Sequence, residues 1–245
     1  MDKKISQYLK SCYKNYVNEL SDEISNFPKT YIFPDGNPIT PVLPIQLIQN
    51  DIMLIGAFPS ARFERRKGKL IPVANNLSPF ATEEYFDGRE IRKQASRDFL
   101  DKYYFPQLNI NPNKIWITDL VKIYLFPEKH IKNCKEISKN KFVNTHNLFF
   151  DIAKSKTNLK YMNEEIKLCN PKLIITLGEV PARVIRNEFK LKNNDLLNGS
   201  INSIKVGNDN YKISSLAHPE IRRRNKEWDK FTVSSVNKLN SELNK

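Results

Sequence analysis

Short apolar runs and longer helical repeats alternate along this chain. The run Ile52–Ala57 is apolar throughout, as expected for a strand buried inside a parallel sheet. Three further runs predict strands: Ile115–Thr118, Leu173–Leu177 and Tyr211–Leu216. Apolar residues at three- and four-residue steps predict helices over residues 1–27, Arg92–Tyr103, Asn133–Ile152, Tyr161–Leu168, Val180–Phe189 and Trp228–Leu243. This alternation indicates an α/β fold, with three α/β/α layers around a central, mostly parallel four-stranded sheet.

We expect one domain spanning residues 1–245. Proline-rich Pro28–Pro44 predicts an extended arm, which packs on the domain together with the first helix. Arg62–Lys69 indicates a basic loop, and Asn75–Gly88 an irregular segment rich in aromatic and acidic residues.

The charge balance points to a polyanionic partner. The chain has 40 Lys and Arg residues against 27 Asp and Glu, a formal net charge of +13. A protein this basic commonly binds nucleic acid or an anionic membrane surface. The alternative is a Lys- and Asn-rich composition inherited from an AT-rich genome. No apolar run approaches the ~18 residues that span a bilayer, and the first residues contain no uninterrupted apolar core of a signal peptide. We therefore expect a cytoplasmic protein that does not insert into a membrane.

No metal or cofactor site is expected. The cysteines are widely spaced, and three thiols cannot supply the four thiolates of a standard iron–sulfur cluster. The histidines His130, His146 and His218 show no zinc-ligand spacing. The chain also lacks the glycine motifs GxGxxG and GxxxxGKS/T, so a nucleotide cofactor is not indicated.

The most distinctive stretch is Leu216–Arg224, LAHPEIRRR, where a histidine and a proline follow a strand and precede three arginines. An imidazole held at a strand end beside cations suits chemistry on a polyanion. A second strand, within Asp51–Ser60 (DIMLIGAFPS), also ends in a Gly/Pro turn. Two such strand ends from distant parts of one α/β domain predict a site at the carboxyl edge of the sheet.

Five short motifs follow one another along the chain: GAFPS (56–60), SPF (78–80), WITDLVK (116–122), TLGEVPA (176–182) and AHPE (217–220). This series resembles the uracil-DNA glycosylase superfamily over roughly residues 45–235. The resemblance implies a monofunctional DNA glycosylase that flips a pyrimidine out of DNA and hydrolyses its N-glycosidic bond. We expect it to act as a monomer without a cofactor. The nearest branch carries an iron–sulfur cluster in its thermophilic members, but the cysteines for that cluster are missing here.

The resemblance assigns the base pocket to Gly56, Phe58, Pro59 and Phe80, with Phe80 as the aromatic on which the base stacks. His218 would donate a hydrogen bond to the negative charge that develops on O2 of the leaving pyrimidine. Both assignments have an alternative. Phe80 could be a core aromatic, and His218 could be a structural histidine that caps a strand end.

The chain departs from the family where other branches place a polar catalytic side chain. Ala57 and Phe58 occupy the two positions after Gly56. The sugar develops oxocarbenium character, so a nearby carboxylate should stabilise it or position water. Asp87 in YFDGR and Glu64 are the two candidate replacements. Each could instead be an ordinary surface acid, and the protein could bind DNA without cutting it.

Asp119 stands where the family reads uracil with an asparagine. A carboxylate has no donor for uracil O4, but it accepts from an exocyclic amino group such as cytosine N4. The expected substrate is therefore a cytosine-type base, and attack on ordinary cytosine would destroy the host genome. A modified cytosine in phage DNA, removed as antiviral defence, satisfies both conditions. The alternatives are an ordinary uracil repair enzyme, an inactive DNA-binding module, and an Asp119 that only pairs with Lys122.

Arg222, Arg223 and Arg224 are expected to hold DNA phosphates beside the flipped nucleotide. Ile221 would fill the vacated place in the base stack, and Arg62 with its basic neighbours would form a second phosphate clamp. The alternative is a solvated charge run at the start of a helix.

Overall fold

The computed structural model describes residues 2–25, 27, 40–59, 61–75, 78–80, 84–86, 90–93, 95–128, 131–138, 145–191, 196–224 and 226–244. The chain divides into two compact units, each assembled from separate stretches. The hairpin unit comprises residues 1–43, 58–94 and 121–162, and the sheet unit comprises residues 44–57, 95–120 and 163–245. The expectation of one domain over the whole chain stays a prediction.

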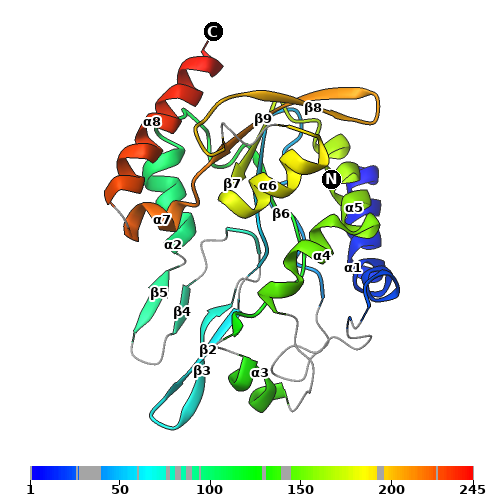
Figure 1. Cartoon of the computed structure of the whole chain (residues 1–245), viewed down its shortest axis with the longest axis vertical. Helices are drawn as coiled ribbons and strands as arrows, with labels where there is room; N and C mark the ends of the chain where they lie inside the picture. The colour runs from blue at the N-terminus through cyan, green and yellow to red at the C-terminus, as the bar shows by residue number, and fades with distance from the viewer. Residues whose placement is uncertain are drawn as a thin grey trace. The chain divides into compact units, whose positions relative to one another are not determined.

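The sheet unit is built on a five-stranded sheet with the order β6-β1-β7-β9-β8 (Figure 1). Its parallel strands are β1 (Ile52–Gly56), β6 (Ile115–Asp119), β7 (Leu173–Leu177) and β9 (Asp209–Leu216). Every residue of β6 and β7 is buried, and side chains alternate between the two faces of a strand, so both faces of these strands are covered. The predicted α/β class and the four predicted strands are confirmed.

The sheet has one strand more than predicted. β8 (Asn202–Val206) lies antiparallel to β9 and pairs Val206 with Asp209. The two-residue loop between the strands contains Gly207 at φ +65°, in the left-handed region that such hairpin loops require. Ile204 and Val206 are buried while the residues beside them are exposed. This alternation and the Gly-Asn loop are the local signals that identify the hairpin.

Helices pack around this sheet. α6 (Glu179–Glu188) lies against β7 and β9, and α8 (Lys226–Leu243) lies against β9. α2 (Ala95–Phe99) continues into a π-helical turn, η1 (Leu100–Tyr104), and packs against α7 (Pro219–Arg224), a short helix that precedes the helix predicted from Trp228. Among the described helices, none combines the length and the apolar character needed to cross a bilayer.

The boundary between the units falls inside α5 (Lys156–Cys169), after Met162. In the sheet unit, Glu165 of α5 accepts a hydrogen bond of 2.6 Å from the indole Nε1 of Trp116 on β6. Both side chains are buried, so this charge-assisted bond ties the helix firmly to the sheet. Burial, reinforced by the charge of Glu165, raises the pKa of the Cys169 thiol, which therefore stays protonated and unreactive.

Within its described residues, the hairpin unit contains two β-hairpins, neither of which was predicted. The paired strands are β2 (Ala61–Arg66) with β3 (Lys69–Asn75), and β4 (Glu84–Phe86) with β5 (Ile91–Lys93). Lys67 and Gly68 join β2 to β3 with φ of +47° and +77°, the geometry of a two-residue hairpin loop. The prediction of a basic loop is therefore wrong, because strand pairing satisfies the backbone groups whatever the charge of the side chains.

The described helical segments of the hairpin unit include α1 (Lys3–Glu23), α3 (Ile131–Ser138), the 3₁₀ turn η3 (His146–Leu148), α4 (Phe149–Lys154) and the first half of α5. The single helix predicted over 133–152 is wrong, because Thr145 forms a β-bridge with Phe126 inside that range. The helix predicted from Arg92 begins at Ala95, because β5 precedes it. Residues 28–39 of the predicted arm, and residues 76–77, 81–83 and 87–88 of the predicted irregular segment, lie outside the described residues.

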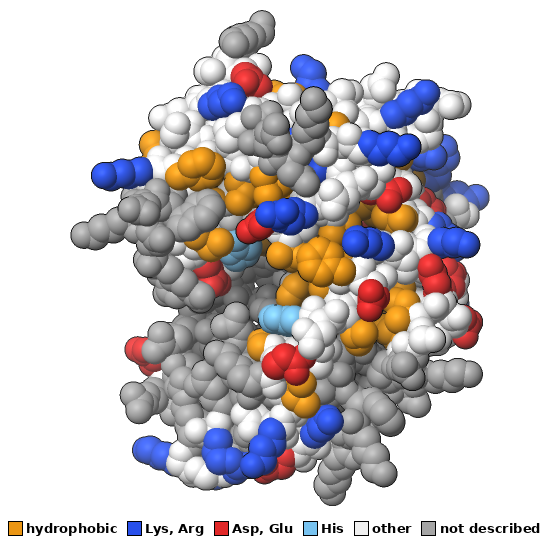
Figure 2. Space-filling model, in the orientation of Figure 1, with side chains coloured by type: hydrophobic (Ala, Val, Ile, Leu, Met, Phe, Trp, Pro, Cys, Tyr) orange, Lys and Arg blue, Asp and Glu red, His pale blue; other side chains and the backbone are white. Residues whose placement is uncertain are grey.

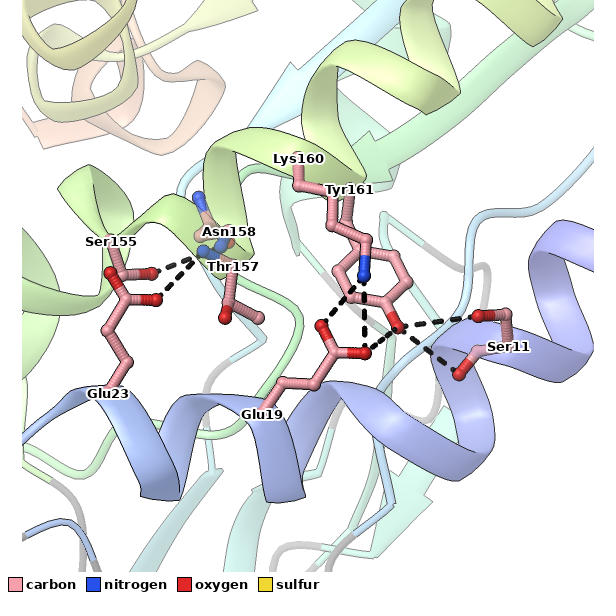
Figure 3. A network of polar contacts seen from close by, with 8 residues as sticks. All are labelled: Ser11, Glu19, Glu23, Ser155, Thr157, Asn158, Lys160 and Tyr161. Atoms are coloured by element: carbon pink, nitrogen blue, oxygen red, sulfur yellow. Dashed lines mark hydrogen bonds and ion pairs between the residues drawn. The ribbon is translucent and has the colours of Figure 1, made fainter.

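α1 packs against the start of α5 through polar side chains (Figure 3). Lys160 forms an ion pair of 2.9 Å with Glu19, and the Tyr161 hydroxyl donates to the carbonyl oxygen of Ser11 at 3.4 Å. Burial, with the charge of Glu19 beside it, raises the pKa of Tyr161 to about 12. The hydroxyl therefore remains a donor throughout the neutral pH range.

Glu23 caps α5 from the neighbouring helix (Figure 3). Its carboxylate accepts hydrogen bonds from the backbone N–H groups of Lys156 at 2.6 Å and Thr157 at 2.9 Å. Negative charge is favourable at a helix N-terminus, where backbone N–H groups lack intrahelical partners. Burial opposes ionisation of this carboxyl, but the two backbone hydrogen bonds outweigh that effect and lower the pKa of Glu23.

Replacing Glu23 with alanine should lower the free energy of unfolding by about 1 kcal/mol, the usual cost of losing a helix N-cap. The folded-state pKa is lowered, so the stabilisation is complete above the pKa of an unfolded-chain glutamate, about 4.3. It is lost as the pH falls through the folded-state value. Chemical denaturation should therefore separate wild type from Glu23→Ala near neutral pH and bring them together in acid. Asp22→Ala, at an exposed neighbour, is the control, and an equal loss in both variants would contradict the cap.

Candidate active site

The carboxyl edge of the sheet collects the ends of four parallel strands. β1 and β6 end side by side, because Gly56 pairs with Asp119 and the Leu120 N–H donates to the Gly56 carbonyl oxygen at 2.9 Å. β7 and β9 likewise end together, with Leu177 paired to Leu216. Polar groups that follow parallel strands meet at this edge. The sheet unit therefore brings the predicted residues Gly56, Asp119 and His218 to one edge.

Asp119 is the last residue of β6 and only 5% exposed. A carboxylate at such a position is expensive to desolvate, so it is found where hydrogen-bond donors surround it or where a ligand supplies them. Its place beside Gly56 is the one expected for a side chain that meets a ligand above the sheet.

His218 forms the N-cap of α7. Its carbonyl oxygen accepts from the Ile221 N–H at 3.0 Å, and its ring Nδ1 accepts from the Glu220 N–H at 3.3 Å. Pro219, whose fixed φ suits the first turn, follows as the first helical residue. An imidazole that accepts at Nδ1 carries its proton on Nε2 when it is neutral. The cap therefore makes the Nε2–H of the half-buried His218 a hydrogen-bond donor.

Gly178 lies beside this histidine in a conformation that requires a glycine. Its φ is +100°, a conformation that L side chains rarely adopt, and a Cβ added there would lie 3.4 Å from Cβ of His218. Its N–H donates to the Leu216 carbonyl oxygen at 2.8 Å. The glycine of the TLGEVPA motif thus permits the positive-φ backbone with which α6 begins beside the His218 segment.

Two side chains near His218 were missed by sequence reasoning. The hydroxyl of Tyr104, which is 1% exposed, donates to the Ala217 carbonyl oxygen at 2.7 Å. The Ser96 hydroxyl donates to the carboxylate of Glu220 at 2.9 Å. Neither residue stands in a motif, and a tyrosine or serine in a predicted helix gives no local sign of a partner so distant in sequence.

The predicted aromatic residues belong to the hairpin unit. Phe58 is half-buried, and its ring centroid lies 4.8 Å from the ring of His146 and 5.5 Å from the ring of Phe149. Pro59 is buried. Phe80 is half-buried and has φ +47°, which is uncommon for a bulky side chain.

For most of the remaining predicted residues the structure describes the backbone position, and one of them lies outside the described residues. Arg62 and Glu64 lie on β2, where they pair with Ala74 and Ile71 of β3. Ile221 is half-buried in α7, and the arginines 222–224 form the last turn of the same helix. Asp87 is outside the described residues. Within the described part of the chain, no three His, Cys, Asp or Glu side chains are grouped to hold a metal ion.

Comparison with known families gives a match over most of the chain. Residues 45–244 match the model of the uracil DNA glycosylase superfamily, which covers most of the chain and includes both strand ends that carry Asp119 and His218. A comparison with curated proteins finds no match.

Proposed function

The chain belongs to the uracil DNA glycosylase superfamily. On that premise we propose that the protein is a monofunctional DNA glycosylase that removes a modified cytosine from phage DNA. Membership of the superfamily supports a DNA glycosylase-type activity. The observation that carries the proposed chemistry is the His218 cap, which directs the ring proton to Nε2 at the carboxyl edge of the sheet.

In the proposed reaction, the target nucleotide leaves the base stack and the bond between C1′ and the base nitrogen breaks. The bonding electron pair goes to the base, and the resulting negative charge develops largely on O2 of a pyrimidine. The Nε2–H of His218 donates to this oxygen, which lowers the energy of the transition state. Water then adds its oxygen to C1′, and the released base takes up a proton. A carboxylate from Glu64 or Asp87 would stabilise the oxocarbenium-like sugar or position that water.

The identity of the base rests on Asp119. A buried carboxylate accepts from an exocyclic amino group such as cytosine N4 but repels the O4 carbonyl of uracil. Cytosine N3 is itself an acceptor, so one proton must be shared between N3 and the carboxylate. A site that leaves a buried polar atom unpaired discriminates strongly against the wrong ligand. Phe80 keeps its proposed role as the aromatic on which the base stacks.

The test is a panel of duplexes that carry uracil, ordinary cytosine or a bulky phage-type modified cytosine. Each duplex is incubated with the full chain, and abasic sites are then cleaved with alkali. We expect cleavage at the modified cytosine. Cleavage at uracil alone would favour an ordinary repair enzyme, and tight binding without cleavage would favour an inactive DNA-binding module. His218→Ala, prepared in parallel, controls for a contaminating glycosylase.

The arginines of α7 are proposed to contact DNA phosphates, although net charge alone does not identify a binding face. In the view of Figure 2, the described Lys and Arg side chains are dispersed and acidic side chains lie among them. A variant with all three arginines 222–224 changed to alanine should bind every duplex more weakly. Its log–log salt dependence should flatten by about 0.9 for each phosphate that the variant no longer neutralises.

The matched control for the arginine variant removes the same charge elsewhere. Lys3, Lys4 and Lys10 are exposed on α1, and their change to alanine also lowers the net charge by three. If the slope flattens equally in both variants, general charge rather than the arginines of α7 controls DNA binding.

A further inference from the structure

Two side chains from neighbouring helical turns hold the chain on both sides of His218. From η1, the Tyr104 hydroxyl donates to the Ala217 carbonyl oxygen at 2.7 Å. From α2, the Ser96 hydroxyl donates to the Glu220 carboxylate at 2.9 Å. Ala217 precedes His218, and the N–H of Glu220 is the group bonded to Nδ1 of the imidazole.

The anchors matter because the cap alone holds the imidazole loosely. The bond from the Glu220 N–H to Nδ1 is 3.3 Å long, at the long end of the range for protein hydrogen bonds. A longer bond leaves the ring and its loop more freedom to turn. Fixing the carbonyl of Ala217 orients the peptide that leads into His218, and fixing the side chain of Glu220 steadies the residue that donates to the ring.

The helical segment α2–η1, which carries Ser96 and Tyr104, is stabilised by contacts of its own. Arg97 of α2 forms an ion pair of 3.0 Å with Asp101 of η1, and its guanidinium lies 5.6 Å from the ring centroid of Phe105. The turn η1 is π-helical, with the Phe105 N–H donating to the Leu100 carbonyl oxygen at 2.9 Å. One extra residue in a turn rotates the following side chains by about 100° relative to an α-helix. The π-helical turn therefore helps to set the direction of Tyr104.

We propose that Tyr104 and Ser96 are positioning residues that fix the direction of the Nε2–H of His218. This inference rests on the proposed function of His218 as the donor to the leaving base. Neither residue is proposed to touch the substrate. They act through Ala217 and Glu220, so their loss should slow bond cleavage without weakening the binding of DNA.

Tyr104→Phe is the sharpest variant, because it removes one oxygen atom and keeps the buried ring. We expect its single-turnover excision rate to fall by about tenfold, since small misplacements of a reacting group cost up to about 10²-fold. DNA affinity should remain unchanged. Ser96→Ala should act in the same direction with a smaller effect. Tyr161→Phe is the matched control, because it also removes a hydroxyl from a fully buried tyrosine and should keep the wild-type rate.

A double-mutant test separates positioning from general destabilisation. In a His218→Ala background, Tyr104→Phe should not slow the residual excision further, because the side chain that it positions is already gone. A second loss of the same size in that background would overturn the inference.

The positioning role can also be tested without measuring activity, so that its failure can be distinguished from failure of the proposed function. Nitrogen-15 NMR of the side chain of His218 reports which ring nitrogen carries the proton of the neutral imidazole. We expect Nε2 in the wild type and in Tyr161→Phe, and a mixture of both tautomers in Tyr104→Phe combined with Ser96→Ala. That mixture in a protein that excises no base would support positioning while refuting the proposed function. A wild-type tautomer and a wild-type rate in the combined variant would overturn the positioning role.

Discussion

Replacing His218 with alanine should lower the single-turnover rate of base excision by about 10²–10³-fold. The Nε2 donor is proposed to act on charge that exists only in the transition state, so its loss should slow the reaction and leave DNA affinity nearly unchanged. Rapid-quench excision assays, followed by strand cleavage at the abasic site, measure the rate. A DNA-binding titration of the same protein measures the affinity.

Two variants separate the imidazole donor from the helix cap. His218→Ala removes both the Nε2 donor and the Nδ1 cap of α7. His218→Asn introduces a strong N-cap residue that can still accept from the Glu220 N–H. Both should excise slowly, but only the alanine variant should lose about 1 kcal/mol of stability. Lys212→Ala, an exposed change on β9, should leave the rate alone. Wild-type excision by His218→Ala would remove this histidine from the mechanism.

Asp119→Asn should shift the preference of the protein from a cytosine-type base towards uracil. The carboxylate accepts from an exocyclic amino group, whereas an amide offers a donor to O4 and an acceptor to N3–H of uracil. One good bidentate pair discriminates by about 1–3 kcal/mol, which corresponds to a change of about 5–150-fold in the ratio of the two excision rates. Single-turnover excision by both proteins on uracil and on modified-cytosine duplexes gives that ratio.

Glu165→Gln is the matched control for this change. It converts another buried carboxylate of the sheet unit to an amide, at a position where the group accepts from Trp116. The amide oxygen can still accept that bond, so the base preference should stay as in the wild type. If the native protein excises uracil as well as Asp119→Asn does, the cytosine hypothesis is wrong and the chain acts as an ordinary uracil repair enzyme.

The local sequence predicted secondary structure well where a buried element is a short, continuous run of apolar residues. The strand Leu173–Leu177 was predicted residue for residue, because a strand covered on both faces must be apolar at every position. The same reasoning located the end of β9 at Leu216 and the ends of β1 and β6 to within one residue, and with them the edge that carries Asp119 and His218. The β2–β3 hairpin and β8 were not predicted, because their local signals were the two-residue loops Lys67-Gly68 and Gly207-Asn208 rather than continuous apolar runs.

The sequence by itself determined the class of fold, the order of its parallel strands along the chain and the residue types at the carboxyl edge. Only the tertiary structure showed which distant side chains form hydrogen bonds to the segments that carry those residues. Tyr104 meets the carbonyl of Ala217 across 113 positions of sequence, and Glu23 meets the N-terminus of α5 across 133. Contacts of this kind depend on the path of all the chain between the partners, and no local spacing encodes that path. The tautomer of His218 depends on a local contact instead, because the Glu220 N–H that bonds to Nδ1 lies only two residues further along the chain, in the first turn of α7.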